Sequence, residues 1–276
     1  DGLDSDSGRK LLSSYEDLGE EQWLYIHGIS RGHPLVLELI NRGASAGAFH
    51  ETLENYVTVE IFSKLSGEQK RLLSALSIYR EPVPLGALAE QDLDTDELDS
   101  LVEQGLARQV ETDIYDVHDL IREFLLRSLD EKRKIDSHSK CAEWYSKANQ
   151  TPGFTIELIY HLINSNSNEE AAKIIVEDGR GLVSLGHMEL LGLIENIELS
   201  EIILESKTSI NQLQGEIMAL LGRFEDAKEV FTEAQNGALK LKNVPVQAEV
   251  LSALADIALK QGNLEDALSM HNDALK

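Results

Sequence analysis

The sequence predicts a mainly helical protein with one small β-hairpin in its middle and stacked helical hairpins towards its C-terminus. The composition favours helix: among 276 residues, aromatic side chains make up only 5% and proline occurs five times, while leucine, alanine, glutamate and isoleucine are abundant. Two short segments near residue 110 are predicted to be strands, because they flank a turn at Thr112-Asp113. A six-residue pattern also recurs forty residues apart in the C-terminal third.

Residues 1–65 are expected to form a helical segment behind a polar end. Residues 1–10 are polar and rich in glycine and serine, which is typical of a frayed end or a linker. Helical patterning begins near Glu20. Gly32-His33-Pro34 predicts the start of a buried helix, because proline at the first helical position loses no hydrogen bond. A further amphipathic helix is expected over residues 49–65.

Residues 66–135 are predicted to form a winged helix, a relative of the helix-turn-helix. Ser66 is a candidate N-cap for a first helix, and a short second helix follows near residues 85–89. Asp94 and Glu97 have the spacing of a capping box that opens a third helix. Segments 106–111 and 114–118 predict two strands around a turn, and Asp119 is expected to cap the closing helix.

Residues 136–276 are predicted to form an α-solenoid of helical hairpins. Gly222-Arg223-Phe224-Glu225-Asp226-Ala227 recurs as Gly262-Asn263-Leu264-Glu265-Asp266-Ala267. The glycine should end one helix, the acidic pair should cap the next, and the alanine should allow close packing. Small residues, Gly215 and Ala255, stand twelve positions before each alanine, which is the spacing of a tetratricopeptide repeat. A degenerate copy is expected at residues 167–171. Such repeats need neighbours, so we expect a piece of a longer protein.

The chain is strongly acidic, with 49 Asp and Glu against 25 Lys and Arg, a net charge of −24. Nucleic acid and anionic membranes attract clustered Lys and Arg, so neither is expected as a partner. The predicted third helix of the winged helix carries four carboxylates and no basic side chain: Asp96, Glu97, Asp99 and Glu103. No apolar run approaches the ~18 residues of a membrane span. A single cysteine, Cys141, rules out an internal disulfide, so a cytoplasmic setting is expected.

The common signatures of catalytic and metal sites are absent. Neither the Gly-Lys of a phosphate-binding loop nor a Gly-x-Gly-x-x-Gly fingerprint occurs, and the eight histidines are scattered. The segment from Gly28 to Gly32 fits the Gly-x-Ser-x-Gly nucleophile elbow around Ser30. Only 27 residues precede it, and they cannot supply the sheet that such an elbow requires. We therefore expect no catalytic residue, metal ligand or cofactor in this segment.

The order of these parts resembles the STAND class of signal-transduction ATPases, which includes the NB-ARC proteins. The resemblance is carried by Gly32-His33-Pro34-Leu35, the winged helix, Val117-His118-Asp119 and the helical repeats. In that class a Gly-x-Pro turn closes the helical lid of the ATPase, and the histidine of a Met-His-Asp motif touches the β-phosphate of ADP. Val117 stands here where the class often has methionine, at a structural position.

The resemblance implies that Gly32, His33, Pro34, His118 and Asp119 contact nucleotide in the full-length protein. That protein would use ATP or ADP with Mg²⁺, and its phosphate loop would lie in an N-terminal nucleotide-binding domain that partners this segment. ADP would hold lid and winged helix together, and ATP would let them part. The repeats would bind a protein, a peptide or a small inducer.

Other interpretations stay open. His118 at a strand–helix junction is also compatible with an ordinary interior histidine, and Gly32-His33-Pro34 with a simple helix start. The whole segment could belong to a transcriptional regulator that contacts DNA elsewhere. It could also be a pure helical-repeat scaffold whose lid motifs are relics.

Overall fold

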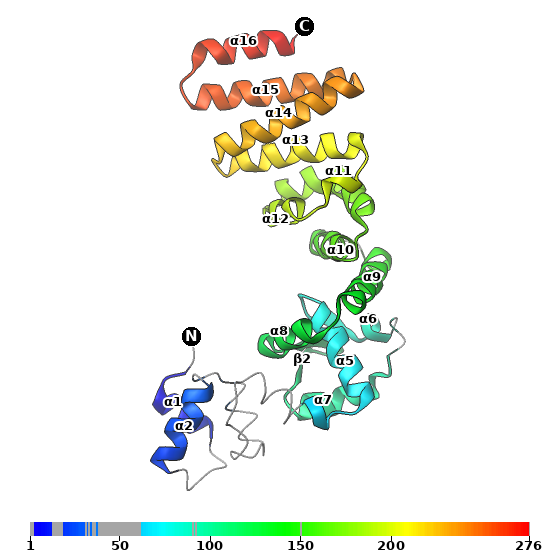
Figure 1. Ribbon diagram of the computed structural model, residues 1–276, viewed down its shortest axis with the longest axis vertical. Coiled ribbons are helices and arrows are strands. Elements are labelled where there is room, and N and C mark those ends of the chain that lie inside the picture. Colours follow the sequence, from blue (N-terminus) through cyan, green and yellow to red (C-terminus); the bar gives the residue numbers. More distant parts are fainter. Residues whose placement is uncertain are drawn as a thin grey trace. The chain divides into compact units, whose positions relative to one another are not determined.

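The computed structural model describes residues 3–12, 19–30, 32, 34, 37, 62–89, 91, 93–149 and 151–275 (Figure 1). The chain divides into two compact units, residues 1–137 and residues 138–276. Most of the described residues are helical, and a small sheet lies in the first unit. The predicted fold class is confirmed: a helical chain carries a hairpin in its middle, followed by helical repeats.

The first unit begins with two helices, α1 (Ser5–Leu11) and α2 (Glu20–Ser30). Asp4 caps α1 by accepting a 2.8 Å hydrogen bond from the backbone N–H of Ser7. The indole of Trp23, which is buried, donates to the Ser5 hydroxyl at 2.8 Å and covers Gly8. The expectation of a frayed end over residues 1–10 is therefore wrong, because a cap and a distant tryptophan hold this helix.

The helical conformation of α2 does not fit a nucleophile elbow at Ser30. The segment from Trp23 to Ile26 is helical, so no strand leads into Ser30. The Ser30 side chain is buried, and its hydroxyl accepts a 3.2 Å hydrogen bond from the N–H of Gly32. The helices expected over residues 35–42 and 49–65 lie largely outside the described residues. Within these ranges the structure describes Leu37, the 3-10 turn η3 (Phe62–Lys64) and Leu65.

The middle of the chain has the order of elements predicted for a winged helix. Its helices are α5 (Gly67–Ile78), α6 (Leu85–Ala89), the 3-10 turn η4 (Thr95–Glu97), α7 (Leu98–Glu103) and α8 (Asp119–Ser128). Its strands are β1 (Val83–Pro84), β2 (Ala107–Glu111) and β3 (Ile114–Val117). They form one antiparallel sheet in the order β1-β3-β2. Strand β1 was not predicted from the sequence, because two residues are too few to show a period.

The caps of this region match the predictions in part. Ser66 caps α5 in a complete capping box with Gln69, with bonds of 3.1 and 3.0 Å. The capping box of Asp94 with Glu97 is wrong: Asp94 accepts from the N–H of Asp96 at 3.1 Å. The Glu97 carboxylate instead accepts from the Gln69 amide at 3.0 Å, so it links η4 to α5.

The second unit is built from helices that stack one after another (Figure 1). Helix α9 (Glu131–Lys147) leads into it. The following elements are α10 (Pro152–Asn164), α11 (Asn168–Ser184), α12 (Leu190–Glu195), the 3-10 turn η5 (Leu199–Glu201), α13 (Leu204–Leu220), α14 (Phe224–Leu241), α15 (Val244–Lys260) and α16 (Leu264–Ala274). The hairpins α13–α14 and α15–α16 repeat the same geometry, as the recurring six-residue pattern predicts.

Each repeat turns at a residue in the left-handed backbone region. Gly222 and Gly262 have φ of 78° and 84°, which glycine adopts without strain. The next residue closes each helix, with N–H bonds of 2.9 Å from Arg223 to Met218 and from Asn263 to Ala258. Asn166 (φ 61°) has the same place before α11, so the segment predicted as a degenerate repeat at residues 167–171 shares this turn conformation.

The small residues of the repeat bring its two helices close together. A Cβ at Gly215 would lie 2.7–2.9 Å from the ring of Phe231, which is fully buried. Ala227 and Ala267 are buried as well, as expected. The acidic pairs do not cap the second helices through their side chains. Glu225 and Asp226 pair instead with Lys228 and Arg223, within the first turn of α14.

Candidate functional site

The first group of residues implied to contact nucleotide lies after helix α2. Gly32 has φ of 70°, and its carbonyl accepts a 2.7 Å hydrogen bond from the N–H of Leu3. A Cβ at Gly32 would collide with the Leu3 backbone, so this position requires glycine for packing alone. Pro34 is helical and exposed, and His33 lies outside the described residues.

The second group lies at the junction between strand β3 and helix α8. His118 is half-buried, and its carbonyl accepts a 2.9 Å hydrogen bond from the N–H of Arg122, which starts the helix. Asp119 is exposed and is the first residue of α8, so the expectation that it caps the helix is wrong: His118 has the cap position, and the Asp119 carboxylate in the first turn favours the helix dipole. His118 and Asp119 therefore lie next to each other at the start of α8, whereas Gly32 and Pro34 follow α2.

A buried carboxylate two residues before His118 was not identified from the sequence. Asp116 is 4% exposed, and its Oδ1 accepts from the N–H of Val117 at 2.8 Å. The guanidinium of Arg122 donates to the same oxygen at 2.5 Å. Arg108 donates through Nε to Oδ2 at 2.9 Å. We call Asp116, Arg108 and Arg122 the Asp116 clasp, and it holds the backbone that leads into His118.

The Asp116 clasp also contacts helix α5. Arg122 also donates to the backbone carbonyls of Leu76 in α5 and Val117 in β3, both at 3.4 Å. Its side chain is 14% exposed, whereas that of Arg108 is 59% exposed. The Arg122 half of the clasp is therefore buried, and the Arg108 half is largely exposed to solvent.

The charges at the junction of β3 and α8 nearly balance. Two arginines and one aspartate give the Asp116 clasp a net charge of +1, and the exposed carboxylate of Asp119, next to His118, offsets it. Across the described residues, no cluster of three His, Cys, Asp or Glu side chains could hold a metal ion.

The second unit carries a charged network on three of its helices. Arg180 of α11 donates to Glu216 of α13 at 2.7 and 3.1 Å, and to Glu249 of α15 at 3.0 Å. Gln212 donates to Glu249 at 2.6 Å. That bond, together with the charge of Arg180, lowers the pKa of Glu249 below its ordinary value. The network joins successive hairpins through polar contacts at a half-exposed surface.

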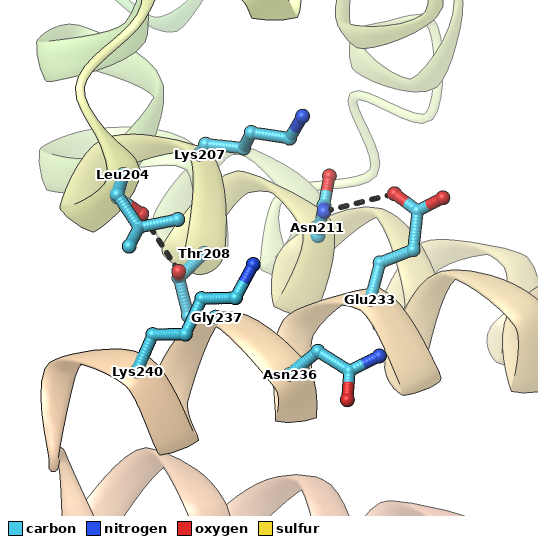
Figure 2. A pocket seen from close by; sticks show the side chains of 8 residues that line it. All are labelled: Leu204, Lys207, Thr208, Asn211, Glu233, Asn236, Gly237 and Lys240. Atoms are coloured by element: carbon cyan, nitrogen blue, oxygen red, sulfur yellow. Dashed lines mark hydrogen bonds between the residues drawn. The ribbon is translucent and has the colours of Figure 1, made fainter.

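A small polar pocket lies between α13 and α14 (Figure 2). Its volume is about 240 Å³. Each helix contributes four residues at the same helical spacing: Leu204, Lys207, Thr208 and Asn211 from α13, and Glu233, Asn236, Gly237 and Lys240 from α14. The helices approach closely here, because a Cβ at Gly237 would collide with the Thr208 side chain.

A larger and more apolar hollow of about 450 Å³ lies among α9, α10 and α11. Leu158, Leu162 and Ile174 line it, with Glu143 and Lys173 among its charged residues. Neither hollow was predicted from the sequence. The helical spacing of the α13 and α14 residues is visible in the sequence, but the register that makes them face one another is not. No described helix has the length and hydropathy that crossing a membrane would require.

Comparison with known proteins agrees with this architecture. Residues 208–276 match the family model of the tetratricopeptide repeat. Over its whole length, the chain is similar in structure to a STAND protein (Signal Transduction ATPase with Numerous Domains) with a tetratricopeptide repeat sensor from Pyrococcus horikoshii. The TM-score is 0.59, the sequence identity is 22%, and the chain covers 41% of that protein's length. No curated protein sequence matches the chain.

These findings bear out the resemblance drawn from the short motifs at the level of fold. The similarity to the STAND protein covers 100% of the chain, so it includes both the region around the Asp116 clasp and the repeats. The repeat match begins within α13 and reaches the last residue. The chain therefore has the fold of part of a STAND protein, and its C-terminal hairpins are tetratricopeptide repeats.

Proposed function

We propose that this chain is the regulatory and partner-binding part of a STAND-type signalling ATPase. The observation that carries the proposal is the similarity of the whole chain to a STAND protein with a tetratricopeptide repeat sensor. In this proposal the winged helix senses the nucleotide, and the repeats bind a protein or peptide partner. The chain has no catalytic role of its own, and the nucleotide-binding domain supplies the phosphate loop and the Mg²⁺ ligands.

His118 is the proposed sensor of the ADP β-phosphate. The Asp116 clasp supports this role, because it fixes the strand end that carries His118. Gly32, His33 and Pro34 are the proposed lid contacts, and Asp119 the helix-starting partner of His118. When bound, ADP supplies the charge that holds lid and winged helix together; the chain's own residues supply the hydrogen bond and the rigid joint.

The experiment measures release of a fluorescent ADP analogue from the complete protein. Replacing His118 by Ala should speed release by about tenfold, the size of one charge-assisted hydrogen bond. His271→Ala, on the surface of the repeats, is the matched control and should leave release unchanged. A complete protein that binds no nucleotide would overturn the proposal in favour of a helical-repeat scaffold.

A DNA-binding regulator is the rival function. The exposed carboxylates of Asp96, Asp99 and Glu103 lie on η4 and α7, where a groove-reading helix would meet phosphates. The same complete protein should therefore show no retention of duplex DNA at low salt. Retention that weakens steeply with added salt would support the regulator instead.

A further inference from the structure

The pocket between α13 and α14 combines two lysines with a buried amide. Lys207 and Lys240 extend from the two facing helices towards the side of the pocket that holds Asn211 (Figure 2). Among the described residues, neither lysine has a carboxylate within ion-pair distance, although the chain has twice as many acidic as basic side chains. Two unneutralised ammonium groups in one pocket attract an anionic group.

Asn211 adds to the pocket a hydrogen-bond acceptor that lacks a donor. It is 2% exposed, and its Nδ2 donates a long 3.3 Å hydrogen bond to Glu233. Its Oδ1 is buried and accepts no hydrogen bond. A buried acceptor without a donor is costly, so the pocket favours a ligand that brings an N–H group to this oxygen. The exposed side chains of Lys240 and Glu233 can shift to admit one.

The two requirements select one ligand class. A plain anion would satisfy the lysines but would face the Glu233 carboxylate and leave Oδ1 of Asn211 without a donor. A plain cation would satisfy Glu233 but would be repelled by Lys207 and Lys240. A molecule with a carboxylate and an ammonium group side by side satisfies both ends. The volume of about 240 Å³ accommodates on the order of eight water-sized groups.

We propose that this pocket binds a small zwitterion of the α-amino acid type. The carboxylate lies between Lys207 and Lys240, and the ammonium group donates to Asn211 Oδ1 and to the Glu233 carboxylate. Asn236 and Leu204 border the place where the ligand's side chain would lie. The site would give the helical repeats a small-molecule input. It does not depend on the proposed nucleotide switch.

The test titrates each of the twenty L-α-amino acids into the chain of residues 1–276, by calorimetry and ligand-observed NMR. At least one should bind. Its N-acetyl derivative, which lacks the ammonium group, and its amide, which lacks the carboxylate, should each bind about tenfold more weakly. Inorganic phosphate, as a plain anion, should not compete.

Single substitutions test whether the amino acid binds in this pocket. Lys240→Gln and Lys207→Gln should each weaken binding about tenfold, and Asn211→Ala should do the same. Lys242→Gln is the matched control, because Lys242 lies two residues beyond Lys240 and does not line the pocket. Circular dichroism checks the fold, and Lys240 is exposed, so its variant tests the site even where Asn211→Ala unfolds. Failure of all twenty amino acids to bind, equal binding of the N-acetyl derivative, or binding unchanged by Lys240→Gln would each overturn the proposal.

Discussion

Nη2 of Arg122 lies 2.5 Å from Oδ1 of Asp116, and this contact joins helix α8 to strand β3. Arg122 carries the joint on to α5 through the carbonyl of Leu76. Three elements of the first unit, α5, β3 and α8, therefore meet at one buried carboxylate. The residue that follows Val117 along the chain is His118, the proposed phosphate sensor.

Replacing Asp116 by Asn should lower the free energy of unfolding by about 3 kcal/mol. Removing one partner of a buried ion pair leaves an uncompensated charge, here on Arg122. Urea unfolding followed by circular dichroism measures the change. Arg127→Gln is the control: both Arg127 and its partner Glu123 are exposed, so its loss should cost less than about 1 kcal/mol. Equal effects of the two substitutions would show that the clasp adds no stability.

Replacing Gly215 by Ala should destabilise the second unit by about 1–3 kcal/mol, the usual cost of overpacking a core. The added methyl group would press on the fully buried ring of Phe231, so the ring or a helix would have to shift. Gly181→Ala in helix α11 is the control. Its Cβ would meet open space, so this change should stabilise by about 0.5–1 kcal/mol. The two glycines should thus shift the thermal unfolding midpoint in opposite directions.

Lys242 offers a stabilising substitution. It ends helix α14 with φ of 56°, at a position where its N–H bonds to the carbonyl of Leu239. The left-handed region costs an ordinary residue roughly 1 kcal/mol, and glycine adopts it freely. Lys242→Gly should therefore raise the urea midpoint, and Gly222→Ala, at φ of 78°, should lower it. A midpoint that falls in both variants would contradict this account.

The sequence predicted features whose cause is local or periodic. The turn at Gly222, the close approach at Gly215 and the Ser66 cap all follow from residue types at fixed spacings. It did not predict α1, because that helix depends on Trp23, eighteen residues beyond Ser5. The left-handed turn at Lys242 was missed because lysine is not a residue type that marks such turns.

The residues of the proposed sites were predictable to different degrees for the same reason. His118 and Asp119 belong to one short motif, so the sequence placed them together at the junction of β3 and α8. The Asp116 clasp was missed because Arg108 and Arg122 lie on opposite sides of Asp116 in the sequence. Pairing of β2 with β3 brings Arg108 to Asp116, and the packing of α8 brings Arg122. The pocket at Asn211 needs the register of two antiparallel helices, which spacing within either helix does not fix.

The Arg180 network predicts a dependence of stability on pH. The hydrogen bond from Gln212 and then the charge of Arg180 lower the pKa of Glu249 in the folded state. A carboxyl with a lowered folded pKa stabilises the fold above its unfolded pKa, about 4.3. That contribution is lost as the pH falls through the folded pKa. Glu249→Gln should therefore destabilise the protein near pH 7, by an amount that shrinks steadily on acidification. Because Glu249 is half-exposed, added salt should also reduce the difference.

An NMR titration of the Glu249 carboxyl supplies the direct measurement. The pKa of Glu249 should rise towards the ordinary value in Gln212→Ala, because this substitution removes the largest cause of the lowered pKa. Gln214→Ala, on the same helix and outside the network, should leave it unchanged. A carboxyl that titrates at the ordinary value in the wild type would show that the network is too exposed to bias its protonation.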